Sequence, residues 1–324
     1  MRSSSTTKSV MQQSLRQRLT YGTLMMAGLL VMLYLDYWIE QKTAGWVKVP
    51  DPHPELYRPR EFGLAGVGLL LMLIVLLPMA TAEVGRLFVA ERVRPYRFLA
   101  GLGSGLLVIH AFMTQFPWFQ HIAASTLAFI IVFVMILAAV RQASGRRTEQ
   151  AITHMAGTVL AMLYLGGLAW FLIALRVKHS VDRVHGFQGS TQAVVMILLV
   201  VKSTDIGAYF GGRYFGRHKL IPWLSPHKTW EGLVCGLATA ALVGLGCSLV
   251  WPQALSTLTW PKALLFGIVI GGVGQAGDLL ESLMKRDAQV KDSGDIIPGF
   301  GGLLDVIDSP LLAAPAAYLL FSLF

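Results

Sequence analysis

The sequence predicts an all-α, polytopic integral membrane protein of about nine transmembrane helices, with a cytoplasmic-side active site in its C-terminal half. Composition is the first observation behind this fold class. Of the 324 residues, 54% are hydrophobic and only 14% are charged, whereas soluble domains carry about 25% charged residues. The second observation is a series of apolar runs close to the length of about 20 residues that crosses a bilayer. The third is that nearly all of the unusual polar motifs lie within residues 202–309.

Nine apolar runs are candidate transmembrane helices: 21–39, 63–82, 98–113, 122–140, 154–175, 191–210, 232–251, 263–280 and 309–324. The third and the last are short, so a count of eight also fits. Cations precede the first run without a small-residue cleavage site, which favours a retained anchor over a removed signal peptide. The predicted organisation has three parts: a disordered cytoplasmic N-terminus at 1–20, a transmembrane scaffold at 21–190 and a catalytic transmembrane region at 191–324.

The cations predict the orientation and argue against a nucleic-acid partner. The net charge is +9, yet the Lys and Arg residues lie in loops beside apolar runs, where anionic lipid headgroups explain them. Lys and Arg are enriched in cytoplasmic loops. With a cytoplasmic N-terminus, the inside loops are 83–97, 141–153, 211–231 and 281–308. Both motif-rich loops then face the cytoplasm, and we expect an integral protein of a bacterial inner membrane with its active site on that side.

The first polar stretch spans residues 202–232. Asp205 lies within an apolar run, which indicates either a pair with Lys202 three residues earlier or a ligand for substrate or metal. The glycines that follow favour either close helix packing or an open pocket. Ser225 and the next residue, a proline, resemble a helix start that could face phosphate. Lys228-Thr229 lacks the preceding glycine spacing of a P-loop, which excludes that motif.

The second polar stretch begins where the run 263–280 ends. One helical face would carry four of its residues, at i, i+3, i+4 and i+7: Asp278, Glu281, Ser282 and Lys285. More charge and glycine follow: Arg286, Lys291, Asp292, Gly299, Gly301, Gly302, Asp305, Asp308 and Ser309. Ionisable residues beside hydrocarbon are costly, so this density indicates a working site. The alternative, a solvated helix end with a surface pair of Glu281 and Lys285, leaves Asp278 unexplained.

A known family shares these motifs. Residues 282–309 resemble the signature of the phosphatidate cytidylyltransferases (CDP-diacylglycerol synthases), in the string Ser282-x-x-Lys285-Arg286, Lys291-Asp292-Ser293-Gly294, Pro298-Gly299-x-Gly301-Gly302-x-Leu-Asp305-x-x-Asp308-Ser309. Two further strings resemble that family's other motifs: Asp205-x-Gly207-Ala-Tyr-Phe and Ser225-Pro226-x-Lys228-Thr229-Trp230-Glu231-Gly232. The resemblance covers about 202–315. Two positions depart from the family pattern: Phe300 stands where His is common, and Val306 where Arg is common.

The resemblance implies that CTP and phosphatidate react to give CDP-diacylglycerol and pyrophosphate in phospholipid biosynthesis. Two polyanions must then meet, so charge neutralisation and positioning dominate catalysis. The expected metal ligands are Asp278 and Asp305, for one or two Mg²⁺ ions, because oxygen ligands suit Mg²⁺. The other expected catalytic residues are Lys285, Arg286, Lys291, Asp292 and Asp308. The expected substrate and nucleotide contacts are Asp205, Ser225, Lys228, Thr229, Glu231, Glu281, Ser282 and Ser309.

Two other functions stay open from the residues alone. A CTP-dependent lipid or polyprenol kinase would use similar charges to pass the γ-phosphoryl group to a lipid hydroxyl, and it would release CDP instead of pyrophosphate. An ion-coupled transporter would favour carboxylates at mid-membrane in repeated halves, and no repeat is visible. The expected partners are therefore CTP, phosphatidate and bilayer lipids. By resemblance alone, two copies are also expected to form a homodimer.

Overall fold

The computed structural model describes residues 3–49, 60–90, 93–146, 148–181, 190–290, 292–294, 297 and 301–324. Its elements, in chain order, are α1 (Ser3–Lys42), β1 (Val47–Val49), β2 (Arg60–Phe62), α2 (Val67–Ala90), α3 (Arg97–Met113), α4 (Pro117–Gln120), α5 (Ala123–Ser144), α6 (Ala151–Met162), a π-helical turn (Leu163–Gly167), α7 (Leu168–Val181), α8 (Ser190–Phe215), β3 (Lys219–Ile221), β4 (Ser225–Thr229), α9 (Trp230–Val250), α10 (Trp260–Asp287) and α11 (Leu304–Leu323).

Eight helical segments of the described chain are long and apolar enough to cross a membrane, if α6, the π-helical turn and α7 are taken as one. Helix α3 is apolar but shorter. Each of the nine predicted runs therefore coincides with one helix, and the predicted class of polytopic, helical membrane protein is confirmed. In the described chain, strands occur only as two short antiparallel pairs, β1 with β2 and β3 with β4.

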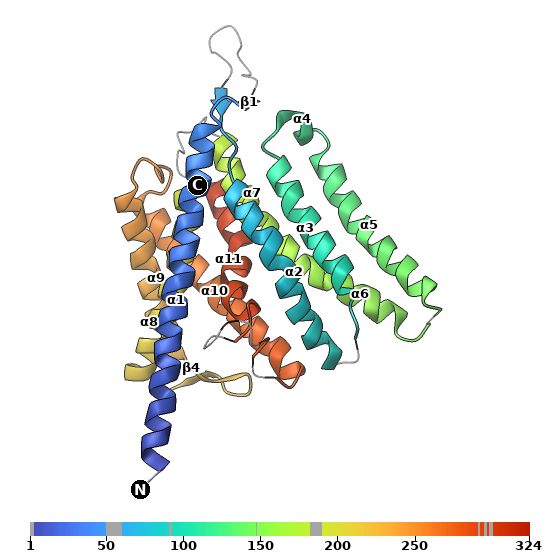
Figure 1. The fold of residues 1–324 in the computed structure, drawn as a ribbon. Coiled ribbons are helices and arrows are strands. Elements are labelled where there is room, and N and C mark those ends of the chain that lie inside the picture. The colour runs from blue at the N-terminus through green and yellow to red at the C-terminus, as the bar shows by residue number, and fades with distance from the viewer. Residues whose placement is uncertain are drawn as a thin grey trace.

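The helices alternate in direction between the two ends of the molecule (Figure 1). The β3–β4 hairpin lies at the same end as the start of α1 and the ends of α2, α5, α8 and α10, and we call this the hairpin end. The β1 strand and the short helix α4 lie at the opposite end. The described residues of the polar motifs therefore lie toward one end of the molecule.

Helix α1 runs without a break from Ser3 and so includes residues 3–20 of the segment 1–20, whose predicted disorder stays a prediction. The segment from residue 10 to residue 20 holds no glycine or proline and is rich in Met, Gln, Leu and Arg, all good helix formers. The Ser/Thr-rich start therefore extends a helix that the following residues already favour.

The helices around the site pack closely through small residues. A Cβ added at Gly211 of α8 would lie 2.3 Å from the Cβ of Cys235 on α9, and one added at Gly236 would lie 2.8 Å from the carbonyl oxygen of Thr204. Small residues at such a seam let two backbones approach within a membrane. The packing interpretation of the glycines near Asp205 therefore holds for Gly211, and the same pairing fixes α8 against α9.

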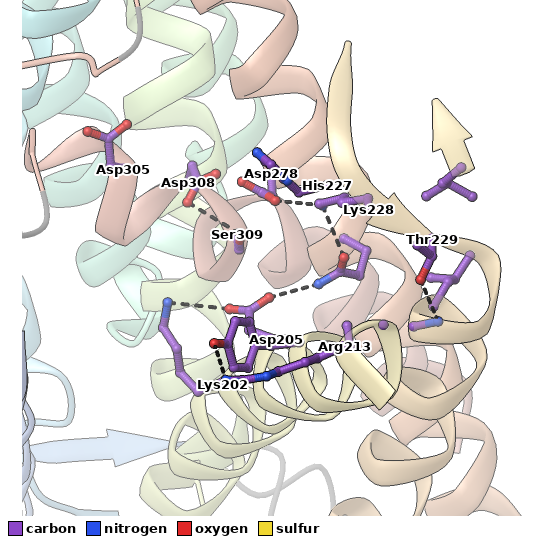
Figure 2. Close-up of a pocket in the computed structure, with 17 residues that line it drawn as sticks. Lys202, Asp205, Arg213, His227, Lys228, Thr229, Asp278, Asp305, Asp308 and Ser309 are labelled. Carbon is purple, nitrogen blue, oxygen red and sulfur yellow. Dashed lines mark hydrogen bonds and ion pairs between the residues drawn. The ribbon is translucent and has the colours of Figure 1, made fainter. Parts of the chain in front are cut away.

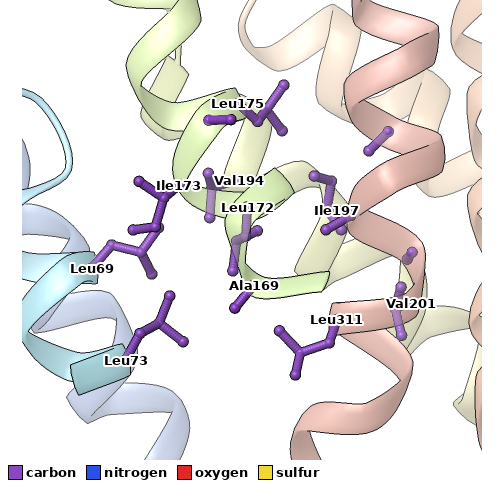
Figure 3. Close-up of a cluster of buried hydrophobic side chains, with 14 of the residues drawn as sticks. Leu69, Leu73, Ala169, Leu172, Ile173, Leu175, Val194, Ile197, Val201 and Leu311 are labelled. Carbon is purple, nitrogen blue, oxygen red and sulfur yellow. The ribbon is translucent and has the colours of Figure 1, made fainter. Parts of the chain in front are cut away.

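The main core lies where α2, α7, α8 and α11 meet. Figure 3 shows its fully buried leucine, isoleucine, valine and alanine side chains, which include Leu69, Ile173, Val194, Ile197 and Leu311. This core connects the N-terminal helices with the helices that carry the polar motifs, so the predicted scaffold and catalytic region share one interior.

A buried ion cluster joins α1 and α7 toward the end opposite the hairpin. Arg176 is 0% exposed, and its guanidinium lies 2.8 Å from Asp36 Oδ2 and 2.8 Å from Glu40 Oε2. Arg176 Nη1 also donates to the Ser190 hydroxyl at 2.6 Å, and Asp36 accepts the backbone N–H of Gly68 at 2.8 Å. The cluster pairs each buried charge with an opposite charge or a hydrogen bond, as buried ions require.

Candidate active site

A pocket of about 540 Å³ opens at the hairpin end, between α8, the hairpin, α9, α10 and α11. Figure 2 shows its charged and polar side chains converging from these elements. The lining residues are Lys202, Asp205, Ala208, Tyr209, Gly212, Arg213, Leu220, His227, Lys228, Thr229, Gly232, Leu233, Gln275, Asp278, Asp305, Asp308 and Ser309. The structure thus brings together seven of the predicted site residues: Asp205, Lys228, Thr229, Asp278, Asp305, Asp308 and Ser309.

A chain of polar contacts crosses this pocket from the hairpin to α8 (Figure 2). Lys228 Nζ lies 2.5 Å from Asp278 Oδ2 and donates to Gln275 Oε1 at 3.0 Å. Gln275 Nε2 in turn donates to Asp205 Oδ1 at 2.8 Å, and Lys202 Nζ lies 3.8 Å from Asp205 Oδ2. Both interpretations of Asp205 therefore apply, since it pairs with Lys202 and also lines the pocket.

Three carboxylates from α10 and α11 gather at one side of the pocket. Asp278, Glu281 and Asp308 each present an oxygen within 4.8 Å of the others. Glu281 is 1% exposed and Asp308 is 3% exposed. Among the described residues, Glu281 Oε1 and Asp308 Oδ2 are buried without a hydrogen-bond partner. Buried carboxylate oxygens that face one another and lack donors have the chemistry of a site for a hard divalent cation.

Lys285 and Asp305 lie beside this carboxylate cluster and connect α10 with the start of α11. Lys285 Nζ is 2.7 Å from Asp305 Oδ1 and 3.2 Å from Glu281 Oε2. Asp305 Oδ2 accepts the backbone N–H of Gly302 at 2.6 Å and that of Ser293 at 3.3 Å. Asp305 was expected to share a metal with Asp278. Its carboxylate pairs with Lys285 and accepts two backbone N–H groups of the loop that precedes α11, and the shared metal stays a prediction.

The expected helix start at Ser225 is wrong, because Ser225–Thr229 forms strand β4. Ser225 pairs with Ile221 and Thr229 with Lys219, which places α9 after the strand. Thr229 is the N-cap of α9, and its hydroxyl accepts the N–H of Gly232 at 3.1 Å. A β-region Thr whose hydroxyl accepts an early helix N–H is a favoured helix start. The hairpin therefore brings Lys228, and not a helix N-terminus at Ser225, to the pocket.

Glu231, which was expected to contact the nucleotide, lies outside the pocket lining. Its carboxylate accepts the N–H groups of Arg217 at 3.1 Å and His218 at 3.2 Å, and it lies 2.6 Å from the His218 ring nitrogen Nδ1. Glu231 thus links the start of α9 to the segment between α8 and β3 by hydrogen bonds, and this contact stabilises the position of the hairpin.

Six other described residues of the predicted site are also absent from the lining. Glu281 and Lys285 lie directly beside it, next to Asp308 and Asp305. Arg286 Nε approaches the Leu224 carbonyl at 3.4 Å, so its side chain reaches toward the hairpin turn. Ser282 is half-buried on α10, Asp292 is exposed, and Ser225 is half-buried on β4. Lys291, together with the departure at Phe300, lies outside the described residues.

Sequence reasoning missed several residues that the structure places at the site. Arg213, His227, Tyr209 and Gln275 line the pocket. Glu83 of α2 is 0% exposed and accepts hydrogen bonds from the segment that precedes α11. Glu83 was placed at the first position of a cytoplasmic loop, but α2 continues to Ala90. The signal that could have found Glu83 and Gln275 is a polar side chain in or directly beside an apolar run.

The sequence profile described as "Cytidylyltransferase family" matches residues 62–324. The chain belongs to the cytidylyltransferase family. The match includes α2 through α11, and thus every element that contributes to the pocket. It also includes Glu83, so the family's extent reaches well beyond the motifs at 202–315 on which the resemblance rested.

Curated proteins resemble the chain over part of their length. A chloroplastic phosphatidate cytidylyltransferase of Arabidopsis thaliana is 33% identical over 242 residues, which cover 69% of this chain and 57% of the plant protein. The phosphatidate cytidylyltransferase of Bacillus subtilis is 33% identical over 222 residues, or 68% of this chain and 78% of that protein. The uncharacterized protein YnbB of Escherichia coli is 38% identical over 162 residues, which cover half of each chain.

Proposed function

We propose that this membrane cytidylyltransferase transfers CMP from CTP to phosphatidate, giving CDP-diacylglycerol and pyrophosphate. The observation that carries the proposal is the pocket at the hairpin end. It combines three described cations, Lys202, Arg213 and Lys228, with four aspartates, at the ends of membrane-length helices. A nucleotide triphosphate and a lipid phosphate need this combination of phosphate-binding cations and oxygen ligands beside hydrocarbon. The relatives named for the same reaction in a bacterium and a plant chloroplast support it.

We assign the divalent cation to Asp278, Glu281 and Asp308. Their mutual approach and the two unpartnered oxygens favour this set over the expected pair of Asp278 and Asp305. Three carboxylates so close together, two of them buried, repel one another unless a cation compensates them. A bound Mg²⁺ would offset the charge of the phosphates and of the departing pyrophosphate. The carboxylates would hold that ion against the pocket, with Lys285 neutralising the adjacent Asp305 and Glu281.

The chain's own residues would then position two phosphates. Lys228, which contacts both Asp278 and Gln275, would bind the triphosphate together with Lys202 and Arg213 of α8. An oxygen of the phosphatidate phosphate forms a bond to the α-phosphorus of CTP. The bond from that phosphorus to the β-phosphate breaks in line, and pyrophosphate leaves. Phosphatidate supplies the attacking oxygen, so no nucleophilic side chain is needed, and catalysis comes from alignment and charge.

The cations at the hairpin end support a cytoplasmic orientation of that end. Exposed Arg and Lys side chains near the ends of α2, α5 and α8, before and at the start of α3, and on β3 include Arg86, Arg94, Arg97, Arg141, Arg146, Arg213, Arg217 and Lys219. Such residues favour the cytoplasmic side, so the pocket would meet soluble CTP there. Phosphatidate would reach it from the adjacent leaflet of a bacterial inner membrane. Pairing of two copies remains a prediction, which crosslinking in membranes would test.

The test uses purified protein in detergent with phosphatidate, Mg²⁺ and CTP labelled on either the α- or the γ-phosphate. Transfer of the α-label into lipid, with release of γ-label as pyrophosphate, is the expected result. Transfer of the γ-label into a lipid with release of CDP would instead establish the lipid kinase. If neither label leaves CTP under any lipid or metal condition, the nucleotidyltransferase proposal is wrong. Asp278→Asn is the loss-of-function comparison, because it removes one carboxylate from the cluster and leaves its size nearly unchanged.

A further inference from the structure

Glu83 holds the start of α11 from a helix in the N-terminal half of the chain. Its carboxylate is 0% exposed, and both of its oxygens are used. Oε1 accepts the backbone N–H of Leu303 at 3.0 Å. Oε2 accepts the N–H of Leu304 at 2.8 Å and the hydroxyl of Ser293 at 3.3 Å. One side chain of α2 therefore bonds to two segments that lie more than 200 positions later in the sequence.

These hydrogen bonds fall where a helix most needs acceptors. The first N–H groups of a helix have no partner within it, and an N-cap side chain usually accepts one of them. The N-cap of α11 is Leu303, whose side chain cannot accept, and the structure gives it no side-chain cap bond. Glu83 takes that role from another helix. A carboxylate at this place also opposes the partial positive charge of the helix N-terminus.

The backbone around Glu83 is shaped to admit its carboxylate. A Cβ added at Gly302 would lie 2.6 Å from Oε2, and one added at Gly294 would lie 2.6 Å from Oε1. Both positions are glycine, so the chain can close around the two oxygens from either side. The carboxylate and the two glycines make a fitted contact between α2 and the segment before α11.

The contacts of Glu83 affect the acidic residues in the first two turns of α11. Asp305 and Asp308 follow the held residues on the same helix, and Asp308 belongs to the carboxylate cluster with Asp278 and Glu281 of α10. The rotation and height of the first turn of α11 decide how near Asp308 stands to α10. We propose that Glu83 is a positioning residue that sets the carboxylates of α11 against those of α10. Its catalytic consequence rests on the proposed function, whereas its effect on the geometry of the cluster does not.

The test variant is Glu83→Gln, which keeps the size of the side chain and replaces one acceptor oxygen with an NH₂ donor. Whichever way the amide turns, the NH₂ opposes the N–H of either Leu303 or Leu304. The matched control is Thr81→Val on the same helix. Thr81 is 1% exposed, and its hydroxyl donates at 2.7 Å to Leu77 of its own helix, so it shares the burial but not the contact with α11.

The expected result has three parts. Partners that orient metal ligands typically contribute 10- to 100-fold, so we expect Glu83→Gln to raise the Mg²⁺ concentration for half-maximal activity about tenfold or more and to lower kcat. The KM for CTP should change little, because the lysines and Arg213 are not displaced. Without any metal or substrate, amide hydrogen exchange should accelerate in peptides covering residues 301–310. Thr81→Val should reproduce none of these changes.

The outcomes separate this inference from the proposed function. If the wild-type protein makes no CDP-diacylglycerol, the proposed function fails, and the exchange experiment together with Mg²⁺-induced thermal stabilisation still decides the role of Glu83. A folded Glu83→Gln protein with wild-type Mg²⁺ dependence and wild-type exchange at 301–310 would overturn the inference alone. Should Glu83→Gln fail to fold, Ser293→Ala removes only the hydroxyl donor. If Ser293→Ala shifts the Mg²⁺ dependence and the hydrogen exchange in the same direction, the inference is supported. If neither quantity shifts, the inference is overturned.

Discussion

Lys228 of the hairpin and Asp278 of α10 form an ion pair across the pocket, with Nζ 2.5 Å from Oδ2. The same ammonium group donates to Gln275, one turn of α10 earlier. The hairpin is thus held against the helix that carries two of the three clustered carboxylates. Both side chains of this pair line the pocket.

The ion pair leads to a prediction for Lys228→Met. Removing the cation would take away the proposed phosphate contact and leave Asp278 without this ion-pair partner, so we expect a higher KM for CTP and a fall in kcat/KM on the order of 10²-fold. Initial rates against CTP concentration measure both. Lys228→Arg keeps the charge and should retain much more activity. Equal activity of Lys228→Met and the wild type would exclude Lys228 from substrate binding.

A second prediction distinguishes the two candidate ligand sets for the cation. If Asp278, Glu281 and Asp308 hold it, then Glu281→Gln should weaken Mg²⁺ activation strongly, by about 10² or more in the concentration required. Asp305→Asn should act mainly on kcat, because it frees Lys285 and loosens the loop at Gly302. Mg²⁺ titrations of activity and of thermal stability test this. A large Mg²⁺ shift in Asp305→Asn, with little in Glu281→Gln, would restore the pair of Asp278 and Asp305.

The transmembrane helices could be predicted because a span must be apolar along its length and satisfy its own backbone hydrogen bonds. Hydropathy marks only the part in hydrocarbon, however. The predicted run 263–280 is the middle of α10, which extends to Asp287, and the run 63–82 overlaps a helix that begins at Val67 and continues to Ala90. The polar ends of both helices hold site residues. That is why Glu83 was taken as a loop residue.

The site was predicted where spacing along one helix decides the geometry. Asp278, Glu281 and Lys285 do share a face of α10, and their contacts confirm it. The roles of Asp305 and Asp308 depend on how α11 is rotated against α10, and sequence spacing does not contain that angle. The contacts that fix the rotation come from Glu83, more than 200 residues away. Similarly, Ser225–Thr229 became a strand through its pairing with Lys219–Ile221.

A third prediction concerns the closest contact in the loop before α11. A Cβ at Gly302 would lie 2.0 Å from the Ser293 hydroxyl oxygen and 2.6 Å from Glu83 Oε2. Gly302→Ala should therefore displace this loop, with a loss of stability of about 1–3 kcal/mol and a loss of activity. Gly246→Ala on α9 is the control, since a Cβ there meets nothing within 4 Å and helix propensity favours Ala. Thermal unfolding in detergent would contradict the prediction if both variants melted alike.

The last prediction separates stability from chemistry at the opposite end of the molecule. Arg176→Met would leave Asp36 and Glu40 buried without the guanidinium, and breaking a buried ion pair on one side costs about 3–5 kcal/mol. We expect a large fall in the unfolding temperature. Mg²⁺ dependence and KM for CTP should be unchanged in the fraction that stays folded. The reason is that the ion cluster lies toward the end of the molecule opposite the pocket. Arg141→Met, an exposed position, should shift stability by no more than about 0.5 kcal/mol. If Arg176→Met instead altered the Mg²⁺ dependence at normal stability, this cluster would have to communicate with the site.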